Sequence, residues 1–151
     1  MLVLHAWGGR KKEGLYSFLC SQYGLSPKTL YEARNMSDPY QYIFSDFLSK
    51  KKGEIQPIFD MVLIDEAQDF PPAFFETIYY ITKEPKRIIW AYDEFQSLNE
   101  LKISDPETLF GTDKDGNPNM SNDSIKGQYE DGIDKDYMLP NSYRNPRKVL
   151  L

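Results

Sequence analysis

The acidic string Asp65-Glu66-Ala67-Gln68-Asp69 directly follows an apolar run over residues 58–64. A run of this composition predicts a strand of a parallel sheet that is covered on both faces. Carboxylates at the carboxyl end of such a strand lie at the rim of the crevice where open α/β sheets bind ligands. Three acids in five residues repel one another unless a cation or ligand compensates their charge. The string therefore predicts a functional site, and the alternative is a solvated acidic turn before a helix.

These residue types have the chemistry of a magnesium–triphosphate site. Mg²⁺ needs a nearby carboxylate, which acts largely through retained waters, and hydrolysis needs a group that orients the attacking water. Asp65 at the strand end suits the metal role, and Glu66 suits the water. Gln96, three residues after Asp93, has an amide that can donate to a phosphate oxygen and accept from the water. Arg144 supplies a planar cation for the γ-phosphate.

The first part of the chain predicts a strand end followed by helices. Helical spacing of apolar residues and helix-start signals place these elements at residues 2–4 (strand end), 15–23, 26–34 and from 38 onward. The third helix is the best signalled, with Asp38 as its N-cap, Pro39 at its first position and Gln41 completing a capping box. A polar link through Gly53 then leads into the second part.

The second part alternates strand and helix. A buried strand over residues 58–64, a helix around residues 74–79 and a second buried strand over 87–92 predict a βαβ unit with a right-handed crossover. A long polar loop over residues 111–136 and a short strand at 137–139 follow. The predicted domains are a strand end with a helical accessory segment (1–53) and a partial ATPase core (54–151). Because a helix begins at Asn145 and the chain stops inside it, we expect a fragment of a longer protein.

Composition limits the class of protein further. The chain has 151 residues, 40% of them hydrophobic, and a formal net charge of −5, which is typical of a globular domain. We expect no membrane partner, since no apolar stretch approaches the roughly 18 residues of a span. The single cysteine, Cys20, excludes an internal disulfide and favours a reducing, cytoplasmic location. Basic residues cluster at 10–12 and 50–52, either as nucleic-acid contacts or as solvated faces.

Three segments of the chain resemble motifs of UvrD/Rep-like superfamily-one DNA helicases. Residues 62–69 (Val-Leu-Ile-Asp-Glu-Ala-Gln-Asp) look like the Walker B motif, or motif II. Residues 90–98 (Trp-Ala-Tyr-Asp-Glu-Phe-Gln-Ser-Leu) are similar to motif III, and residues 139–146 (Leu-Pro-Asn-Ser-Tyr-Arg-Asn-Pro) to motif IV. The resemblance implies an α/β, RecA-like domain of the P-loop NTPase type, whose parallel sheet is flanked by helices. It also implies ATP and Mg²⁺ as cofactors and ATP-driven movement along single-stranded DNA.

The resemblance also implies a role for each matching residue. Asp65 would hold Mg²⁺, and Glu66 would activate the attacking water. Gln68 and Gln96 would sense the γ-phosphate and couple it to DNA, and Arg144 would contact the γ-phosphate. The remaining helicase domains of the same protein would complete the site.

His5 and Trp7 lie in a segment, residues 2–9, that resembles motif Ib, which meets the DNA strand. A base stacked on the indole of Trp7 would contribute roughly 1–3 kcal/mol. The alternative is that Trp7 belongs to the core and that His5 is a satisfied residue at a strand end.

The chain departs from the helicase pattern at several points. It has no Gly-x-x-x-x-Gly-Lys-[Ser/Thr] sequence, so the phosphate-cradling loop is absent. Tyr92 stands where motif III usually has glycine, and no segment resembles motifs V and VI. We therefore expect this piece to be inactive by itself.

Two other functions are compatible with parts of the sequence. One is a catalytically inactive scaffold of helicase descent, favoured by the missing loop. The other is a two-metal nuclease built from Asp60, Asp65, Glu66 and Asp69. A string from Asp113 to Asn117 looks superficially like a calcium loop, but an Asp-Gly turn explains it better.

Overall fold

The computed structural model describes residues 1–8, 13–92 and 104–138. The described chain is a mixed α/β structure with one two-stranded parallel sheet. Its helices and strands are α1 (Leu15–Gln22), α2 (Leu30–Ala33), α3 (Pro39–Lys51), β1 (Val62–Ile64), α4 (Pro72–Ile81), β2 (Ile88–Trp90) and α5 (Pro106–Leu109). Three short 3-10 helices complete the list: η1 (Lys52–Glu54), η2 (Ala67–Asp69) and η3 (Asn122–Ile125).

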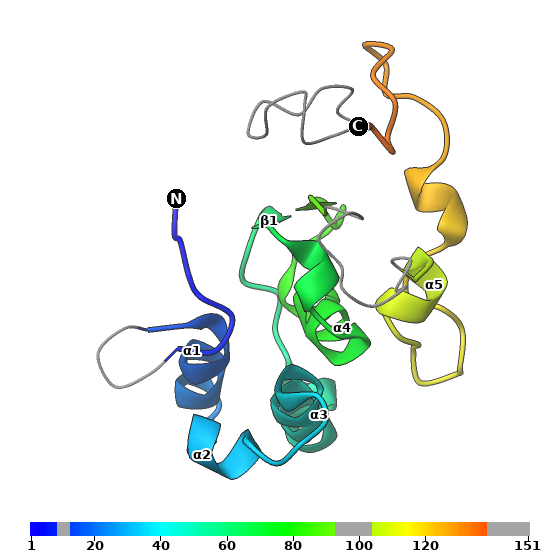
Figure 1. Cartoon of the computed structure of the whole chain (residues 1–151). Helices are drawn as coiled ribbons and strands as arrows, with labels where there is room; N and C mark the ends of the chain where they lie inside the picture. The colour runs from blue at the N-terminus through cyan, green and yellow to red at the C-terminus, as the bar shows by residue number, and fades with distance from the viewer. Residues whose placement is uncertain (9–12, 93–103, 139–151) are drawn as a thin grey trace, which may run out of the picture.

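The predicted βαβ unit is present. β1 and β2 pair in parallel, with Leu63 opposite Ile89, and α4 is the crossover between them. Figure 1 shows α4 beside the strands, with α1, α2 and α3 together on the side away from the sheet. Both strands are shorter than predicted, so Asp60 precedes β1 instead of lying within it.

Only one face of this sheet is covered within the described residues. Ile64 and Ile88 point to the same face and are buried in the hydrophobic core. On the opposite face, Leu63 is 65% exposed and Ile89 is 52% exposed. The prediction of strands covered on both faces is therefore wrong for the described structure, because its single crossover helix shields one side.

The hydrophobic core is continuous across the predicted domain boundary at residue 53. The ring of Phe44 on α3 lies 5.2 Å from that of Phe74 on α4, edge to face. The ring of Tyr16 on α1 also contacts that of Phe44, with ring centres 5.8 Å apart. Such aromatic pairs add about 0.5–1.5 kcal/mol beyond the area they bury, so this row ties the helical segment to the βαβ unit.

The start of α3 agrees with the sequence only in part. Asp38 accepts a hydrogen bond from the Gln41 amide at 2.8 Å, as an N-cap does. The side chain of Gln41, however, does not complete a capping box on α3. Its Oε1 instead accepts a hydrogen bond from the amide of Ala73 at 3.2 Å. Pro71 at the N-cap of α4 has no side-chain oxygen, so Gln41 satisfies an otherwise orphan donor of a different helix.

We expect Gln41→Ala to destabilise the fold by about 0.5–2 kcal/mol, the usual cost of losing a helix cap. Urea unfolding followed by circular dichroism measures this change. Gln22→Ala is the matched control, because that glutamine is exposed on α1, whose caps are Gly14 and Tyr23. Equal stability of the two variants would show that Gln41 does not cap α4.

Other predicted elements are smaller in the structure. Residues 2–4 form no strand, and the next residue, His5, forms an isolated bridge with Gly14. The helix predicted over 26–34 is limited to α2, which Thr29 and Glu32 start with a capping box. Tyr137 and Met138 are exposed and form no strand, while residue 139 lies outside the described residues. No helix in the described ranges is long and apolar enough to cross a membrane.

Candidate functional site

The acidic string forms a tight turn at the carboxyl end of β1 and leads into η2. Two backbone hydrogen bonds tie this turn to the end of β2. The amide of Ala91 donates to Ile64 O at 2.8 Å, and the amide of Ala67 donates to Ala91 O at 2.9 Å. The carboxyl ends of both strands and the acids therefore meet at one edge of the sheet, as the sequence predicted.

Glu66 has the least usual backbone in this turn. Its φ of 51° and ψ of 46° place a residue with a side chain in the left-handed region, which non-glycine residues seldom occupy. The surrounding turn maintains it: Asp69 donates its amide to Glu66 O at 3.0 Å, and Asp65 Oδ1 accepts from the Glu66 amide at 3.1 Å. Uncommon backbone conformations of this kind cluster at functional sites.

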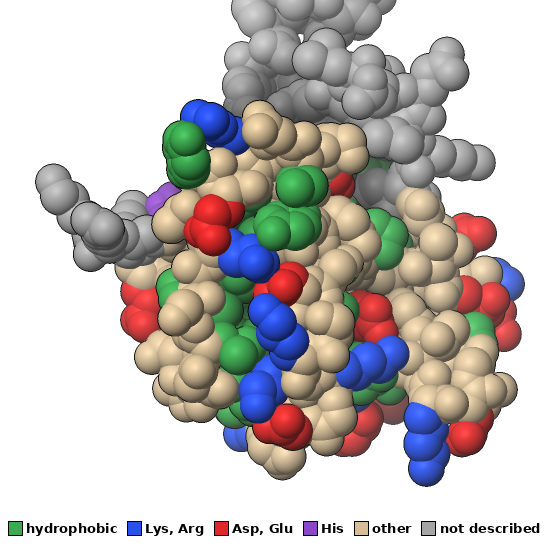
Figure 2. All heavy atoms as spheres, turned by 90° about the horizontal axis from the view of Figure 1, so that it is seen from below, with side chains coloured by type: hydrophobic (Ala, Val, Ile, Leu, Met, Phe, Trp, Pro, Cys, Tyr) green, Lys and Arg blue, Asp and Glu red, His purple; other side chains and the backbone are tan. Residues whose placement is uncertain are grey.

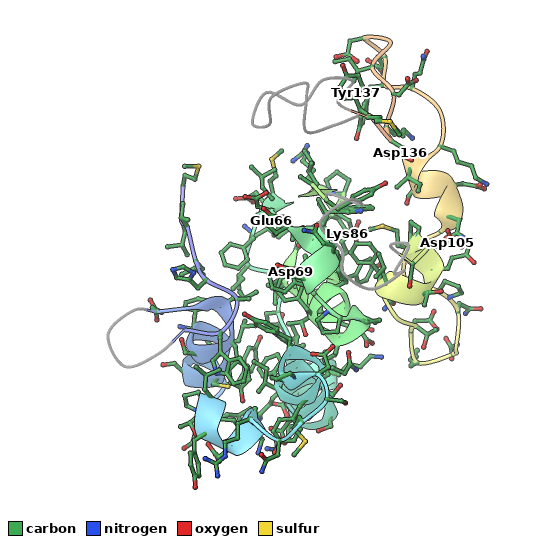
Figure 3. The ribbon with its side chains drawn as sticks, in the orientation of Figure 1. Glu66, Asp69, Lys86, Asp105, Asp136 and Tyr137 are labelled. Atoms are coloured by element: carbon green, nitrogen blue, oxygen red, sulfur yellow. The ribbon has the colours of Figure 1, made fainter. Side chains whose placement is uncertain are left out.

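The side chains of Glu66 and Gln68 form a pair. Gln68 Nε2 donates to Glu66 Oε2 at 2.6 Å, which orients the half-buried carboxylate. Figure 3 shows Glu66 and Asp69 on the turn between β1 and α4. The arrangement presents one carboxylate held by an amide next to an exposed one, Asp65.

Asp65 is chemically suited to Mg²⁺ bound with a nucleotide. Such ions use one or two protein carboxylates, several waters and the phosphate oxygens of the substrate. Within the described part of the chain, no three His, Cys, Asp or Glu side chains are grouped as a metal cage. Asp65 could serve as such a carboxylate for an ion that also binds phosphate oxygens.

The nuclease alternative has no support from the geometry. Asp60 lies before β1, away from its carboxyl end, and accepts a hydrogen bond from Lys83 Nζ at 2.9 Å. The hydrogen bond and the positive charge of Lys83 lower the pKa of the Asp60 carboxyl. Asp60 is thus engaged in a surface ion pair and does not join the acids of the turn.

Trp7 is a core residue in this structure. Its Nε1 donates to Lys28 O at 3.1 Å, and the rings of Tyr16 and Tyr40 meet it at 6.3 and 5.7 Å. The packing alternative therefore describes Trp7, and the buried indole offers no open face to a base. His5 is exposed, and its carbonyl accepts from the amide of Leu15 at 2.7 Å.

Gln96 and Arg144 lie outside the described residues, as do most of the segments that resemble motifs III and IV. The described part of the segment that resembles motif III ends with Tyr92, which is exposed just after β2. The geometry of the candidate site thus rests on Asp65, Glu66 and Gln68.

The basic run at residues 50–52 is balanced by acids. Lys50 pairs with Asp46, Lys51 with Glu54, and Lys52 with Glu76, at 2.7, 2.8 and 2.7 Å. Figure 2 shows blue and red side chains interspersed on the face that it presents. The solvated-face alternative, with each lysine paired to an acid, therefore describes this run better than a nucleic-acid contact does.

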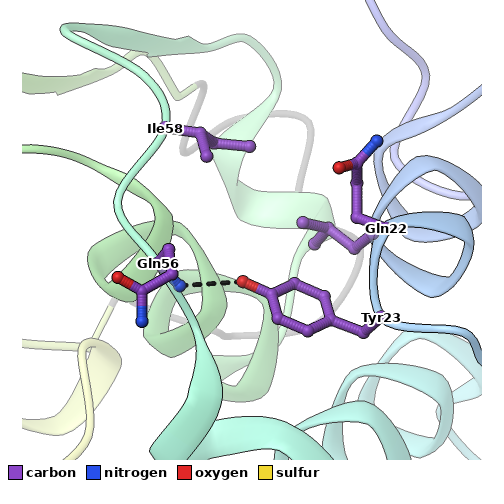
Figure 4. A pocket seen from close by; sticks show the side chains of 5 residues that line it. Gln22, Tyr23, Gln56 and Ile58 are labelled. Atoms are coloured by element: carbon purple, nitrogen blue, oxygen red, sulfur yellow. Dashed lines mark hydrogen bonds between the residues drawn. The ribbon is translucent and has the colours of Figure 1, made fainter.

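A separate open pocket lies between α1 and the segment that leads into β1 (Figure 4). It is lined by Leu19, Gln22, Tyr23, Gln56 and Ile58. The amide of Gln56 donates to the Tyr23 hydroxyl at 2.8 Å. None of its lining residues is charged, and none belongs to the acidic turn.

The sequence did not predict that Ala91 positions the acidic turn. Its carbonyl holds the amide of Ala67, one residue after Glu66, so the end of β2 positions the acidic turn. No sequence signal could have identified this residue, because the interaction uses only the backbone.

Comparisons with protein families, with curated proteins and with solved structures found no match to this chain. The class of protein is therefore defined by fold and site alone. It is a mixed α/β protein with a parallel βαβ unit and an acidic turn at the carboxyl ends of its two strands.

Proposed function

We propose that this chain is part of an ATP-dependent DNA helicase or translocase of the UvrD/Rep type. It would contribute the acidic side of the ATP site in a RecA-like domain. The observation that carries the proposal is the turn after β1, where Glu66 has a left-handed backbone and the end of β2 holds the neighbouring amide of Ala67. This is the place where open α/β sheets bind ligands.

The described residues have distinct parts in this proposal. Asp65 would hold Mg²⁺, and the ion would supply charge neutralisation to the triphosphate. Glu66 orients the attacking water and accepts its proton at the carboxylate. Gln68 orients the Glu66 carboxylate through its hydrogen bond at 2.6 Å. A movement of Gln68 would therefore change the orientation of that carboxylate. Gln96 and Arg144 are proposed, from the sequence resemblance, to contact the γ-phosphate.

The proposal requires partners outside this chain. The phosphate-cradling loop has to come from other residues, because no Gly-x-x-x-x-Gly-Lys-[Ser/Thr] sequence occurs here. The remaining helicase domains and single-stranded DNA are the proposed partners, in the cytoplasm. With Trp7 buried, the proposed DNA contact of this segment is limited to His5, which is exposed.

An inactive scaffold of helicase descent is the second candidate. The missing phosphate loop favours it, since a protein without that loop cannot bind nucleotide in the usual way. The scaffold needs neither the left-handed Glu66 nor its hydrogen bond with Gln68, which favour the enzyme.

Two measurements test the proposed function. We expect the chain by itself to bind Mg–ATP with a Kd weaker than about 1 mM by calorimetry, since it lacks the loop amides and lysine that hold the phosphates. We expect the complete protein to hydrolyse ATP, and single-stranded DNA to stimulate the reaction. A complete protein that binds neither ATP nor DNA would support the scaffold instead.

A further inference from the structure

Two segments of the polar region fold in the same way. We call residues 111–119 the first hairpin and residues 127–135 the second hairpin. Each begins with glycine and contains Asp-Gly at the same offset, and each is closed by one antiparallel bridge. The bridges join Thr112 to Pro118 and Gln128 to Asp134.

Backbone hydrogen bonds match at equivalent positions of the two hairpins. Asp113 N donates to Asn117 O at 2.8 Å, and its equivalent, Tyr129 N, donates to Ile133 O at 2.9 Å. A second matched pair joins Asn119 N to Gly111 O and Lys135 N to Gly127 O, at 2.9 and 3.0 Å. Glycine with positive φ stands at equivalent positions, 111 and 127, and 116 and 132. The region is therefore a tandem structural repeat.

The first hairpin is docked on the body of the protein. Lys52 Nζ donates to Thr112 O at 2.9 Å and also pairs with Glu76 on α4. Tyr80 donates its hydroxyl to the same carbonyl at 3.4 Å. A lysine and an aromatic side chain thus form the receptor for the first hairpin, and the buried ring of Phe110 anchors the chain beside it.

The second hairpin has no such receptor in the described chain. Tyr129 is 56% exposed and Ile133 is 52% exposed, although a backbone hydrogen bond joins them across the hairpin. Tyr137 and Met138, which follow it, are also exposed. Figure 1 shows this segment, in orange, on the side away from α1, α2 and α3, and Figure 3 labels Asp136 and Tyr137 on it.

The charge of this surface is strongly negative. Residues 127–138 carry four carboxylates and a single lysine; the carboxylates are Glu130, Asp131, Asp134 and Asp136. The ammonium of that lysine, Lys135, lies 6.0 Å from the centre of the Tyr129 ring. The ring therefore already accepts a cation, and phosphate-bearing partners are repelled.

We propose that the second hairpin docks onto a basic protein surface that bears lysine and aromatic side chains, as the first hairpin docks onto Lys52 and Tyr80. The negative charge of the second hairpin favours lysines on the partner surface. The exposed side chains of Tyr129 and Ile133 would supply the apolar contacts that anchor the partner. The carbonyl of Gln128 would accept from a partner lysine, as Thr112 O accepts from Lys52. This inference is independent of ATP hydrolysis.

A defined peptide tests the proposal. The probe is a fluorescein-labelled peptide with the sequence Lys-Tyr-Gly repeated four times, titrated with the whole chain and followed by fluorescence anisotropy at low salt. We expect a Kd on the order of 100 µM. The double variant Tyr129→Ser/Ile133→Ser keeps every charge and should weaken binding by about tenfold or more, because the anchor is lost.

The matched control is Leu30→Ser/Tyr31→Ser, which removes an exposed apolar pair on α2 and should leave binding unchanged. Circular dichroism confirms that both variants remain folded. Equal binding by the double variant and the parent would overturn the proposal. Equally tight binding of a twelve-nucleotide single-stranded DNA or of the Glu-Tyr-Gly counterpart peptide would also overturn it. Self-association of the parent chain that disappears in the Tyr129→Ser/Ile133→Ser variant would overturn the proposal as well. The second hairpin would then bind a second copy of this chain and not a basic partner.

Discussion

Replacing Glu66 by glutamine in the complete protein is expected to lower ATP hydrolysis by about 10²–10⁴-fold, the usual contribution of a general base. The amide cannot accept the proton of the attacking water, whereas its size and hydrogen bonds resemble those of the carboxylate. Nucleotide and single-stranded DNA binding should therefore be retained. The measurement pairs the steady-state rate of DNA-stimulated hydrolysis with equilibrium binding of ATP.

Asp60→Asn is the matched control for this variant. It makes the same chemical change on a carboxylate close in sequence, but Asp60 lies before β1 and pairs with Lys83. Its hydrolysis rate should equal that of the parent. If Glu66→Gln hydrolysed ATP within threefold of the parent, Glu66 would have no part in activating water. The backbone of the turn after β1 would then need another explanation.

Replacing Phe110 by alanine is expected to destabilise the protein by about 3–5 kcal/mol, the range for a large aromatic side chain removed from a core. Phe110 is 0% exposed, and its ring lies 5.5 Å from those of Phe75 and Trp90. The loss combines the transfer free energy of the ring with the cavity that remains. Urea unfolding measured by circular dichroism gives the difference in the free energy of unfolding.

Tyr137→Ala is the control for Phe110→Ala, because it also truncates an aromatic side chain but at an exposed position. Its effect should stay within about 0.5 kcal/mol, as is usual for surface substitutions. A loss below about 1 kcal/mol for Phe110→Ala would mean that Phe110 is not a core anchor. The polar region after α5 would then be attached to the body mainly by its hydrogen bonds.

Local signals explain most of the agreement between sequence and structure. The cap at Asp38 and the proline that follows it lie within four residues of the bonds they determine, so α3 begins where the sequence predicts. The helical spacing around Phe74 and Phe75 likewise predicts the buried side of α4, because periodicity reports which face a helix buries.

The candidate site also has features that the sequence predicted and features that it did not. The position of the acids after β1 follows from the order of elements, since both strands of a parallel βαβ unit end at one edge. No sequence signal predicted the left-handed backbone of Glu66. None predicted the hydrogen bond from the Ala67 amide to Ala91 O either. The contact with Ala91 depends on a strand more than twenty residues further along the chain.

The sequence by itself determined the βαβ order, the main helix starts and the place of the acidic turn, because these depend on neighbours close in the chain. Only the tertiary structure decided that Trp7 is buried, that Gln41 caps α4 and that one face of the sheet is open. It also decided that the first hairpin is docked while the second is exposed. Each of these depends on partners from distant segments, which local residue patterns do not specify.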